Sequence, residues 1–243
     1  MRYRYKLIEN SDIKGSQFQM QTKVVPNHLL DKALGVKLNW FSPIEKDDFK
    51  EYQLNGLQMK TVLGLSDEAI DDLNKFWPSR EPQWDGIAMS DNDTLYLIEA
   101  KSHLSEITPA SEGKSEENTE KKNDSILKVA QSVYGIDMDE PTKNAWTHKY
   151  YQISNRLAFA HKMKELITPS TKFNDVVMVF INFVNDDTWK QQGLMVSDSN
   201  VWNEKYKVIL KEMKLSKPLL DANNVIIINL DVELKHSNMR QDK

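Results

Sequence analysis

Three nearly continuous apolar runs constrain the fold of this chain more than any other feature of its sequence. They cover residues 95–98, 176–184 and 225–230, and the last two are rich in β-branched side chains. Strands of this kind are apolar on both faces, so both faces of their sheet must be covered. Segments with helical periodicity cover residues 125–134, 146–167 and 201–213. We therefore expect an α/β layered fold with helices on both faces of the sheet.

Composition limits the classes of protein that this chain can belong to. Its 243 residues, 40% of them hydrophobic, are enough for one domain with a packed core. The chain has no cysteine, which excludes disulfide scaffolds, zinc-thiolate sites, iron-sulfur clusters and cysteine nucleophiles. Residues 1–14 lack the apolar core of a signal peptide, and the run 176–184 is too short to span a bilayer. We therefore expect a cytoplasmic protein without a membrane partner.

The net charge of −4 argues against a protein that coats nucleic acid by bulk attraction. It does not argue against an enzyme, because the basic contacts of an enzyme can be confined to one groove while acidic side chains hold a metal. Phosphate-binding glycine loops, a dinucleotide-binding glycine motif and a G-x-S-x-G elbow are absent from the sequence. The scattered histidines have no zinc-site spacing, and we expect His103 to be solvated.

Other segments carry local signals for secondary structure. Residues 2–8 and 18–25 read as two edge strands, within a small N-terminal extension that covers residues 1–41. Ser42-Pro43 and Ser66 are helix-start signals, which predict helices over 44–52 and 67–77. The polar stretch 109–124 has almost no apolar residue, so we expect a mobile loop there.

The most informative segment is a hairpin with charged residues at one end. Asp85 begins its first strand, residues 84–90, and Glu99 and Lys101 end its second strand, residues 94–101. Because side chains at i and i+2 of a strand share a face, Glu99 and Lys101 project together. Asp85 joins them only if an odd number of residues turns the chain, so we predict a three-residue loop, 91–93, that places Asp85 opposite Glu99.

Charged groups beside a core must be paired or must bind an ion. The carboxylates of Asp85 and Glu99, with the backbone carbonyl of Ala100, offer the hard oxygen ligands that Mg²⁺ prefers. Lys101 would then lie beside the attacking water. It could orient or deprotonate that water, or stabilise the charge of the phosphate, and the sequence leaves both roles open.

A carboxylate, a short hairpin and Glu-x-Lys after an apolar strand resemble the signature of the PD-(D/E)XK nucleases. The resemblance covers residues 42–185, although the family's proline is displaced to Pro82. It implies a restriction-endonuclease-like fold, with a central mixed β-sheet flanked by helices. It also implies that Asp85 and Glu99 bind Mg²⁺ or Mn²⁺ and that Lys101 is the catalytic lysine.

A second element supports this resemblance. Many relatives carry a glutamine-containing motif on the helix that follows the Glu-x-Lys strand, and this chain has Tyr-Gln-Ile-Ser-Asn-Arg at 151–156. Gln152 and Arg156 share one face of that helix, so we add both to the candidate catalytic residues. A further glutamate often assists in the family, and Glu51 and Glu68 are both candidates.

These observations predict a metal-dependent nuclease that hydrolyses phosphodiester bonds of DNA. One alternative is a catalytically inactive module that keeps the nuclease fold and binds nucleic acid or a protein. Another is an α/β protein in which the acidic cluster is structural. The choice of DNA over RNA, the cleavage polarity and the formation of a homodimer stay open at this stage.

Overall fold

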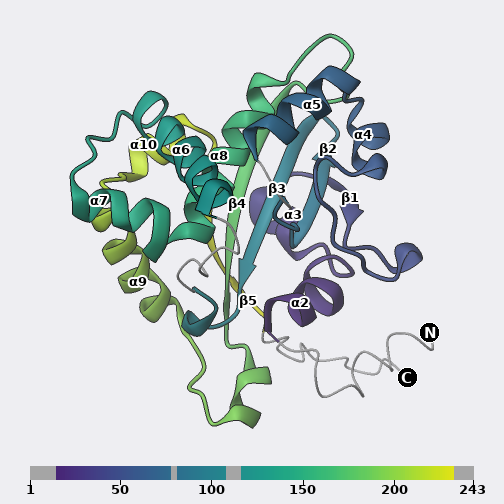
Figure 1. The fold of residues 1–243 in the computed structure, drawn as a ribbon. Coiled ribbons are helices and arrows are strands. Elements are labelled where there is room, and N and C mark those ends of the chain that lie inside the picture. The colour runs from purple at the N-terminus through teal and green to yellow at the C-terminus, as the bar shows by residue number, and fades with distance from the viewer. Residues whose placement is uncertain (1–14, 78–80, 108–115, 233–243) are drawn as a thin grey trace.

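The computed structural model describes residues 15–77, 81–107 and 116–232. They form an α/β fold around one five-stranded sheet of order β1-β2-β3-β4-β5, as Figure 1 shows. Its strands are β1 (Leu38–Ser42), β2 (Gly86–Ser90), β3 (Thr94–Lys101), β4 (Asp175–Val184) and β5 (Val225–Asp231). The first three strands are antiparallel neighbours, and β3, β4 and β5 run parallel to one another, so the sheet is mixed.

Helices cover both faces of this sheet, as the apolar strands required. On one face, Leu95, Leu97 and Val176 belong to the larger hydrophobic core. The helices of that face are α4 (Leu57–Leu63), α5 (Asp67–Phe76), α6 (Glu116–Ser132), α8 (Tyr151–Glu165), α9 (Ser199–Glu212) and α10 (Lys217–Ala222). In Figure 1, α6, α8 and α9 group on one side of β4, with the short α7 (Glu140–Asn144) and the π-helical η4 (Ala145–Lys149) leading into α8.

The opposite face is covered by the N-terminal part of the chain. Tyr96, Ile98 and Ala100 point to this side of β3 and belong to a second core. The covering elements are α2 (Gly15–Gln19), the π-helical η1 (Met20–Val24) and α3 (Leu29–Leu34). The described part of the segment predicted as a small N-terminal extension therefore covers one face of the sheet. β1, at the end of this segment, is an edge strand of the sheet.

The hairpin register confirms the predicted three-residue loop. Gly86 pairs with Ile98 and Met89 pairs with Leu95, which leaves residues 91–93 as the turn. Asp93 adopts the left-handed conformation, with φ 56°, and its amide donates to the Ser90 carbonyl at 3.1 Å. One step beyond Gly86, this register brings Asp85 opposite Glu99.

Most of the predicted helices and strands after residue 60 are present. Ser66 caps α5 by accepting a hydrogen bond from the Ala69 amide at 3.2 Å, as the start signal predicted. β4, β5, α8 and α9 match the predicted runs within a few residues. In the described part of the chain, no helix is both long and apolar enough to cross a membrane.

The strand predicted over residues 18–25 is wrong. Residues 18–24 are helical rather than a strand, because Met20 and Val24, one turn apart, both bury their side chains against the second face of the sheet. The predicted strand at 2–8 lies outside the described residues.

The helix predicted over 44–52 is reduced to the single 3-10 turn η2 (Glu45–Asp47). Ser42 belongs to β1, and its hydroxyl donates to the Lys50 carbonyl at 2.8 Å instead of capping a helix. Asp48 and Phe49 both have φ 54°, a left-handed conformation that ends the turn.

The mobile loop predicted over 109–124 is also wrong in its second half. Residues 116–124 form the first turns of α6, whereas residues 109–115 lie outside the described residues. Ile126, Val129 and Ala130 anchor the helix in the larger core, and its polar first half extends from that anchor. Glu117 and Lys121 add an i,i+4 ion pair at 3.0 Å, which stabilises the polar first half of the helix.

Candidate functional site

The predicted site residues meet at the carboxyl end of β3. Glu99 and Lys101 follow Leu95 and Leu97 on the face toward α8, because alternate residues of a strand share a face. Asp85 comes directly before β2, the antiparallel neighbour of β3. Charged side chains from two adjacent strands are therefore gathered on one face of the sheet, as the sequence predicted.

Glu99 is the best-paired acid of this cluster. Only 3% of the residue is exposed, and its carboxylate accepts from Lys101 Nζ at 2.5 Å through Oε1. Its Oε2 accepts from Arg156 Nε at 2.6 Å and lies 2.5 Å from Nη2 of the same guanidinium. Burial opposes ionisation of Glu99, but the charges of Arg156 and Lys101 outweigh it and hold the pKa of this carboxyl below its usual range.

Asp85 has much weaker compensation. Its Oδ2 accepts one hydrogen bond, from the Ala100 amide at 2.7 Å. Burial, followed by the negative charge of Glu99, raises the pKa of Asp85 to about 7, against the opposing effect of Lys101. This carboxyl therefore keeps its proton to a higher pH than an exposed aspartate does, and the buried cluster is short of positive charge.

Besides its contacts with Glu99, Arg156 makes two hydrogen bonds and one ring contact that fix its orientation. Its Nη2 donates to the Gln83 carbonyl at 2.8 Å, and Nη1 donates to Asn155 Oδ1 at 3.1 Å. The guanidinium also lies over the Trp84 ring, 4.6 Å from its centroid. Arg156, on the helix face predicted from the sequence, thus reaches the acidic cluster and provides a counter-charge for Glu99.

Gln152 lies one turn before Arg156 and lines a small cavity with Glu99 and Lys101. The cavity has a volume of about 10 Å³, and Tyr150 and Tyr206 also border it. Gln152 Oε1 is buried and has no hydrogen-bond partner among the described residues. This space suits one water-sized group that donates a hydrogen bond.

Lys101 is an ammonium in this arrangement. Burial disfavours its charge, but Glu99 and then Asp85 outweigh burial and raise the pKa of Lys101. A lysine with a raised pKa is a poor general base and a good electrostatic partner for an anion.

The structure distinguishes the two candidates for an additional glutamate. Burial and then the charge of Glu99 raise the pKa of Glu51, which also interacts with Arg156 and Lys101, so Glu51 belongs to the cluster. It lies outside any helix, directly before Tyr52, which forms an isolated bridge with Trp84. Glu68 is exposed in the first turn of α5, where its own amide and Ser66 lower its pKa, and it is not brought to the cluster.

A second polar network, which was not predicted from the sequence, begins at Ser102, directly after Lys101. The Ser102 hydroxyl donates to Asp186, and the Ser102 amide donates to Glu106 Oε2 at 2.5 Å. Burial raises the pKa of Glu106, and its charge in turn acts on Lys101. The position of Asp186, two residues after the apolar strand β4, was a signal that could have found it.

A row of amides also continues from Lys101 across the sheet. Lys101, Asn182 and Asn229 are in register on β3, β4 and β5. Asn182 is fully buried and donates to Asn229 Oδ1 at 3.0 Å, while its own Oδ1 has no partner among the described residues. The sequence had shown Asn182 only as an interruption of an apolar run.

His103 does not join the acidic cluster through any described contact. Its Nδ1 accepts from the Ser105 amide at 3.1 Å, and its ring lies 5.2 Å from the ring of Trp189. The tryptophans at 77, 84 and 146 are buried core residues.

Two carboxylates and a main-chain carbonyl remain the donor set for a metal. Within residues 15–77, 81–107 and 116–232, no three acidic or histidine side chains are arranged to hold an ion together. Both oxygens of Glu99 are already engaged by cations, so an ion at this position would either share Oε1 with Lys101 or displace one of the two cations. Comparison of the chain with protein-family models, with curated proteins and with solved structures finds no match.

Proposed function

We propose that this protein is a metal-dependent nuclease that hydrolyses phosphodiester bonds of DNA. The observation that carries the proposal is the convergence of Asp85, Glu99 and Lys101 from two adjacent strands, with the acids short of positive charge. Buried carboxylates that lack compensation bind cations or protons. A divalent cation meets that need and is also the usual catalyst of phosphodiester hydrolysis.

The proposed fold is the restriction-endonuclease-like one, of PD-(D/E)XK type. It is supported by the mixed sheet, in which the antiparallel pair β2 and β3 carries the acids and the parallel strand β4 follows a long helical segment. The loop that places Asp85 opposite Glu99 is a further support, because any even-numbered loop would separate the acids.

The residues present fit a hard divalent cation. Asp85 and Glu99 would hold Mg²⁺ or Mn²⁺ together with the carbonyl of Ala100, and Glu51 is near enough to interact with Glu99. When bound, the ion would supply charge compensation for the phosphate and activation of a water molecule. The proton that Asp85 holds near neutral pH would be lost on binding.

The other residues act on substrate and on one another. Lys101, as an ammonium, stabilises the negative charge that grows on the phosphate, which its raised pKa favours over a role as general base. Arg156 balances Glu99 and holds it against the sheet. Gln152 Oε1 has no partner among the residues that the structure describes, and it can orient a water molecule by accepting a hydrogen bond from it.

Nuclease activity is tested with supercoiled plasmid and labelled single-stranded DNA, with Mg²⁺, with Mn²⁺ and with EDTA. The proposal expects metal-dependent cleavage that falls at least 100-fold in Lys101→Ala and in Asp85→Asn. Lys207→Ala is the matched control, because this lysine is exposed on α9 and pairs with Glu204. Cleavage that persists in EDTA, or in Lys101→Ala, contradicts the proposal.

Metal binding is tested separately by thermal unfolding. A ligand at 100 times its Kd stabilises the folded state by about 2.7 kcal/mol, so a titration of Mn²⁺ should raise the Tm of the wild type. Asp85→Asn should lose most of this shift. An equal shift in both proteins would place the ion elsewhere.

A second candidate function is a binding module without turnover. Glu99 is neutralised by two cations and borders a cavity of only about 10 Å³, an arrangement that is stable without an ion. This function predicts DNA or protein binding that does not require metal, with the DNA left intact.

A further inference from the structure

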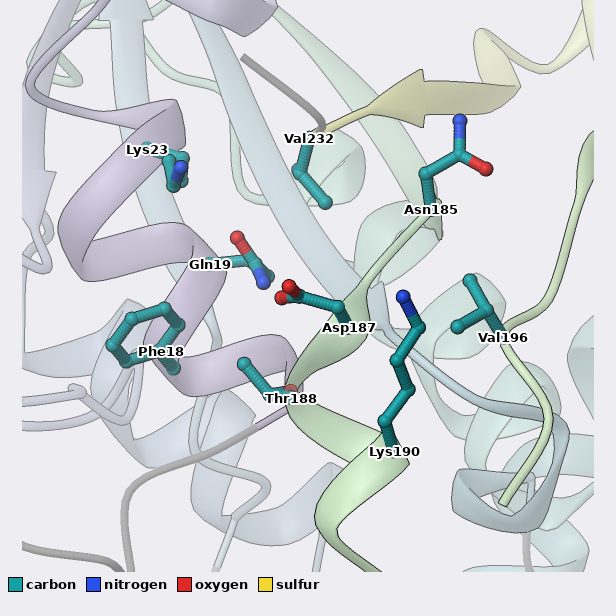
Figure 2. A pocket seen from close by; sticks show the side chains of 9 residues that line it. All are labelled: Phe18, Gln19, Lys23, Asn185, Asp187, Thr188, Lys190, Val196 and Val232. Atoms are coloured by element: carbon teal, nitrogen blue, oxygen red, sulfur yellow. The ribbon is translucent and has the colours of Figure 1, made fainter. Parts of the chain in front are cut away.

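A second and larger pocket lies at the carboxyl ends of β4 and β5, apart from the Asp85 cluster. Figure 2 shows Phe18, Gln19 and Lys23 on its helical wall and Asp187 and Lys190 on the wall opposite. Its volume is about 550 Å³, which is the size of pockets that bind small molecules. The carboxyl ends of parallel strands are also where α/β folds usually bind ligands.

Gln19 points to the kind of ligand this pocket requires. It is 2% exposed, and its Nε2 donates to Asp186 Oδ1 at 2.7 Å. Because a carboxylate only accepts, this bond fixes which way the amide is turned. Gln19 Oε1 is then buried without a partner among the described residues, which is costly unless a ligand donates to it.

Asp186 holds this amide and is not available to a ligand. Besides Gln19, it accepts from the Thr188 amide at 2.9 Å and the Thr188 hydroxyl at 2.7 Å. The Ser102 hydroxyl occupies its other oxygen. These hydrogen bonds stabilise its carboxylate within the protein, and Asp186 serves as a support below the pocket.

Two lysines make the pocket suitable for an anion. Lys23 and Lys190 both line it, and neither forms an ion pair with any residue in the described part of the chain. Two ammonium groups at one pocket suit a phosphate, which carries two charges near neutral pH. Asp187 can accept from hydroxyl groups, and the ring of Phe18 offers an apolar face.

We propose that this pocket binds a nucleoside monophosphate unit. The phosphate lies at Lys23 and Lys190, a hydroxyl or amino group donates to Gln19 Oε1, and the base packs on Phe18. Such a unit can be a free nucleotide or part of a nucleic acid strand. The second source rests on the proposed function, because Ser102, which follows Lys101, hydrogen-bonds to the Asp186 support and so links the pocket to the nuclease cluster.

The test measures binding of adenosine 5′-monophosphate and of inorganic phosphate by calorimetry. It measures binding of a labelled single-stranded oligonucleotide by fluorescence anisotropy. Combined Lys23→Ala and Lys190→Ala should weaken binding of the monophosphate at least 10-fold, with Lys207→Ala as the control. Gln19→Leu should remove the preference for the nucleotide over inorganic phosphate. Its circular dichroism, compared with that of the wild type, checks that it folds.

The results separate the two sources and the two sites. Loss of oligonucleotide binding in the lysine variant indicates a strand, whereas loss of monophosphate binding alone indicates a free nucleotide. Lys101→Ala should bind the monophosphate as the wild type does, so failure of the nuclease proposal leaves this one standing. Absence of binding to both the monophosphate and the oligonucleotide, or equal binding by the lysine variant and the wild type, overturns it.

Discussion

Replacement of Arg156 by methionine measures how strongly the acidic cluster depends on its arginine. Methionine keeps an apolar stem against Trp84 but removes the bonds to Glu99 and to the Gln83 carbonyl. Breaking a buried ion pair by removing one partner costs about 3 to 5 kcal/mol, because the other charge stays buried. Lys101 remains within 2.5 Å of Glu99, so we expect the lower half of that range, about 3 to 4 kcal/mol.

The assay is urea unfolding at pH 7.5, followed by fluorescence and by circular dichroism. The same measurement on Glu99→Gln and on the double variant closes a thermodynamic cycle. We expect a coupling of about 1 to 3 kcal/mol, since the second change removes the unpaired charge that the first one leaves. Lys207→Met is the control, because Lys207 and Glu204 are also 2.5 Å apart but 70% exposed, and such pairs contribute less than about 1 kcal/mol.

A loss below about 1 kcal/mol in Arg156→Met would refute this reasoning. So would additive effects of the two single variants, because they would mean that Glu99 does not depend on the guanidinium. A change in the urea m-value would instead indicate an altered unfolded or native state, and the cycle would then be repeated by thermal unfolding.

Three further changes test separate parts of the structure. Burial raises the pKa of Glu81 to about 7, so the stabilisation from its protonated form is complete below about pH 4.5 and is lost as the pH rises through 7. Relative to Glu81→Gln, the wild type should lose about 2 to 3 kcal/mol of unfolding free energy between pH 5 and pH 8 in urea unfolding, and parallel pH profiles would contradict this. Ser66→Ala removes the cap that accepts from the Ala69 amide and should cost about 1 kcal/mol, a Tm decrease of about 2 to 4 °C by calorimetry; an unchanged Tm would show that the cap is not stabilising. Gly86→Ala would place a Cβ atom 2.9 Å from the Trp40 ring and should cost about 1 to 3 kcal/mol in the same assay, with an altered near-UV spectrum; wild-type stability would mean that the contact relaxes freely.

The sheet could be predicted from sequence where side-chain periodicity alone decides the structure. β3 is apolar on both faces and is central, and β4 and β5 follow the two β-branched runs. The turn 91–93 was predicted from parity, because only an odd loop puts Asp85 and Glu99 on one face. These features depend on neighbours in sequence or on strands joined by a short turn.

The N-terminal helices could not be predicted in this way, because distant contacts determine them. Residues 18–24 include Phe18, Thr22 and Val24, which favour strands, yet Met20 and Val24 gain burial only as one helical face packed on the sheet. The tightness of this packing is visible at Gly86, where an added Cβ would lie 3.0 Å from Met20 Cε. Local propensity is a weak signal where tertiary burial opposes it.

The site was predictable in its residue types but not in its pairing. Strand spacing placed Glu99 and Lys101 together, and helical spacing placed Gln152 and Arg156 on one face. Nothing in the spacing shows that Arg156, 57 positions after Glu99, takes that carboxylate as its partner. The sequence named Glu51 and Glu68 as candidates but could not choose between them for the same reason, since distant contacts bring Glu51 to the cluster.

The pairing of charges explains why the pKa values of the acids in the cluster differ. Three carboxyl groups, those of Asp85, Glu99 and Glu51, face two cations, Lys101 and Arg156, and both cations bind Glu99. Burial, followed by the negative charge of Glu99, raises the pKa values of Asp85 and Glu51, so these two acids favour a proton that would supply the missing positive charge. A divalent cation would replace that proton and leave the cluster with an excess of positive charge. An excess of that sign is what a phosphodiester requires, so the charge shortage that makes the cluster costly to bury also suits it to the proposed substrate.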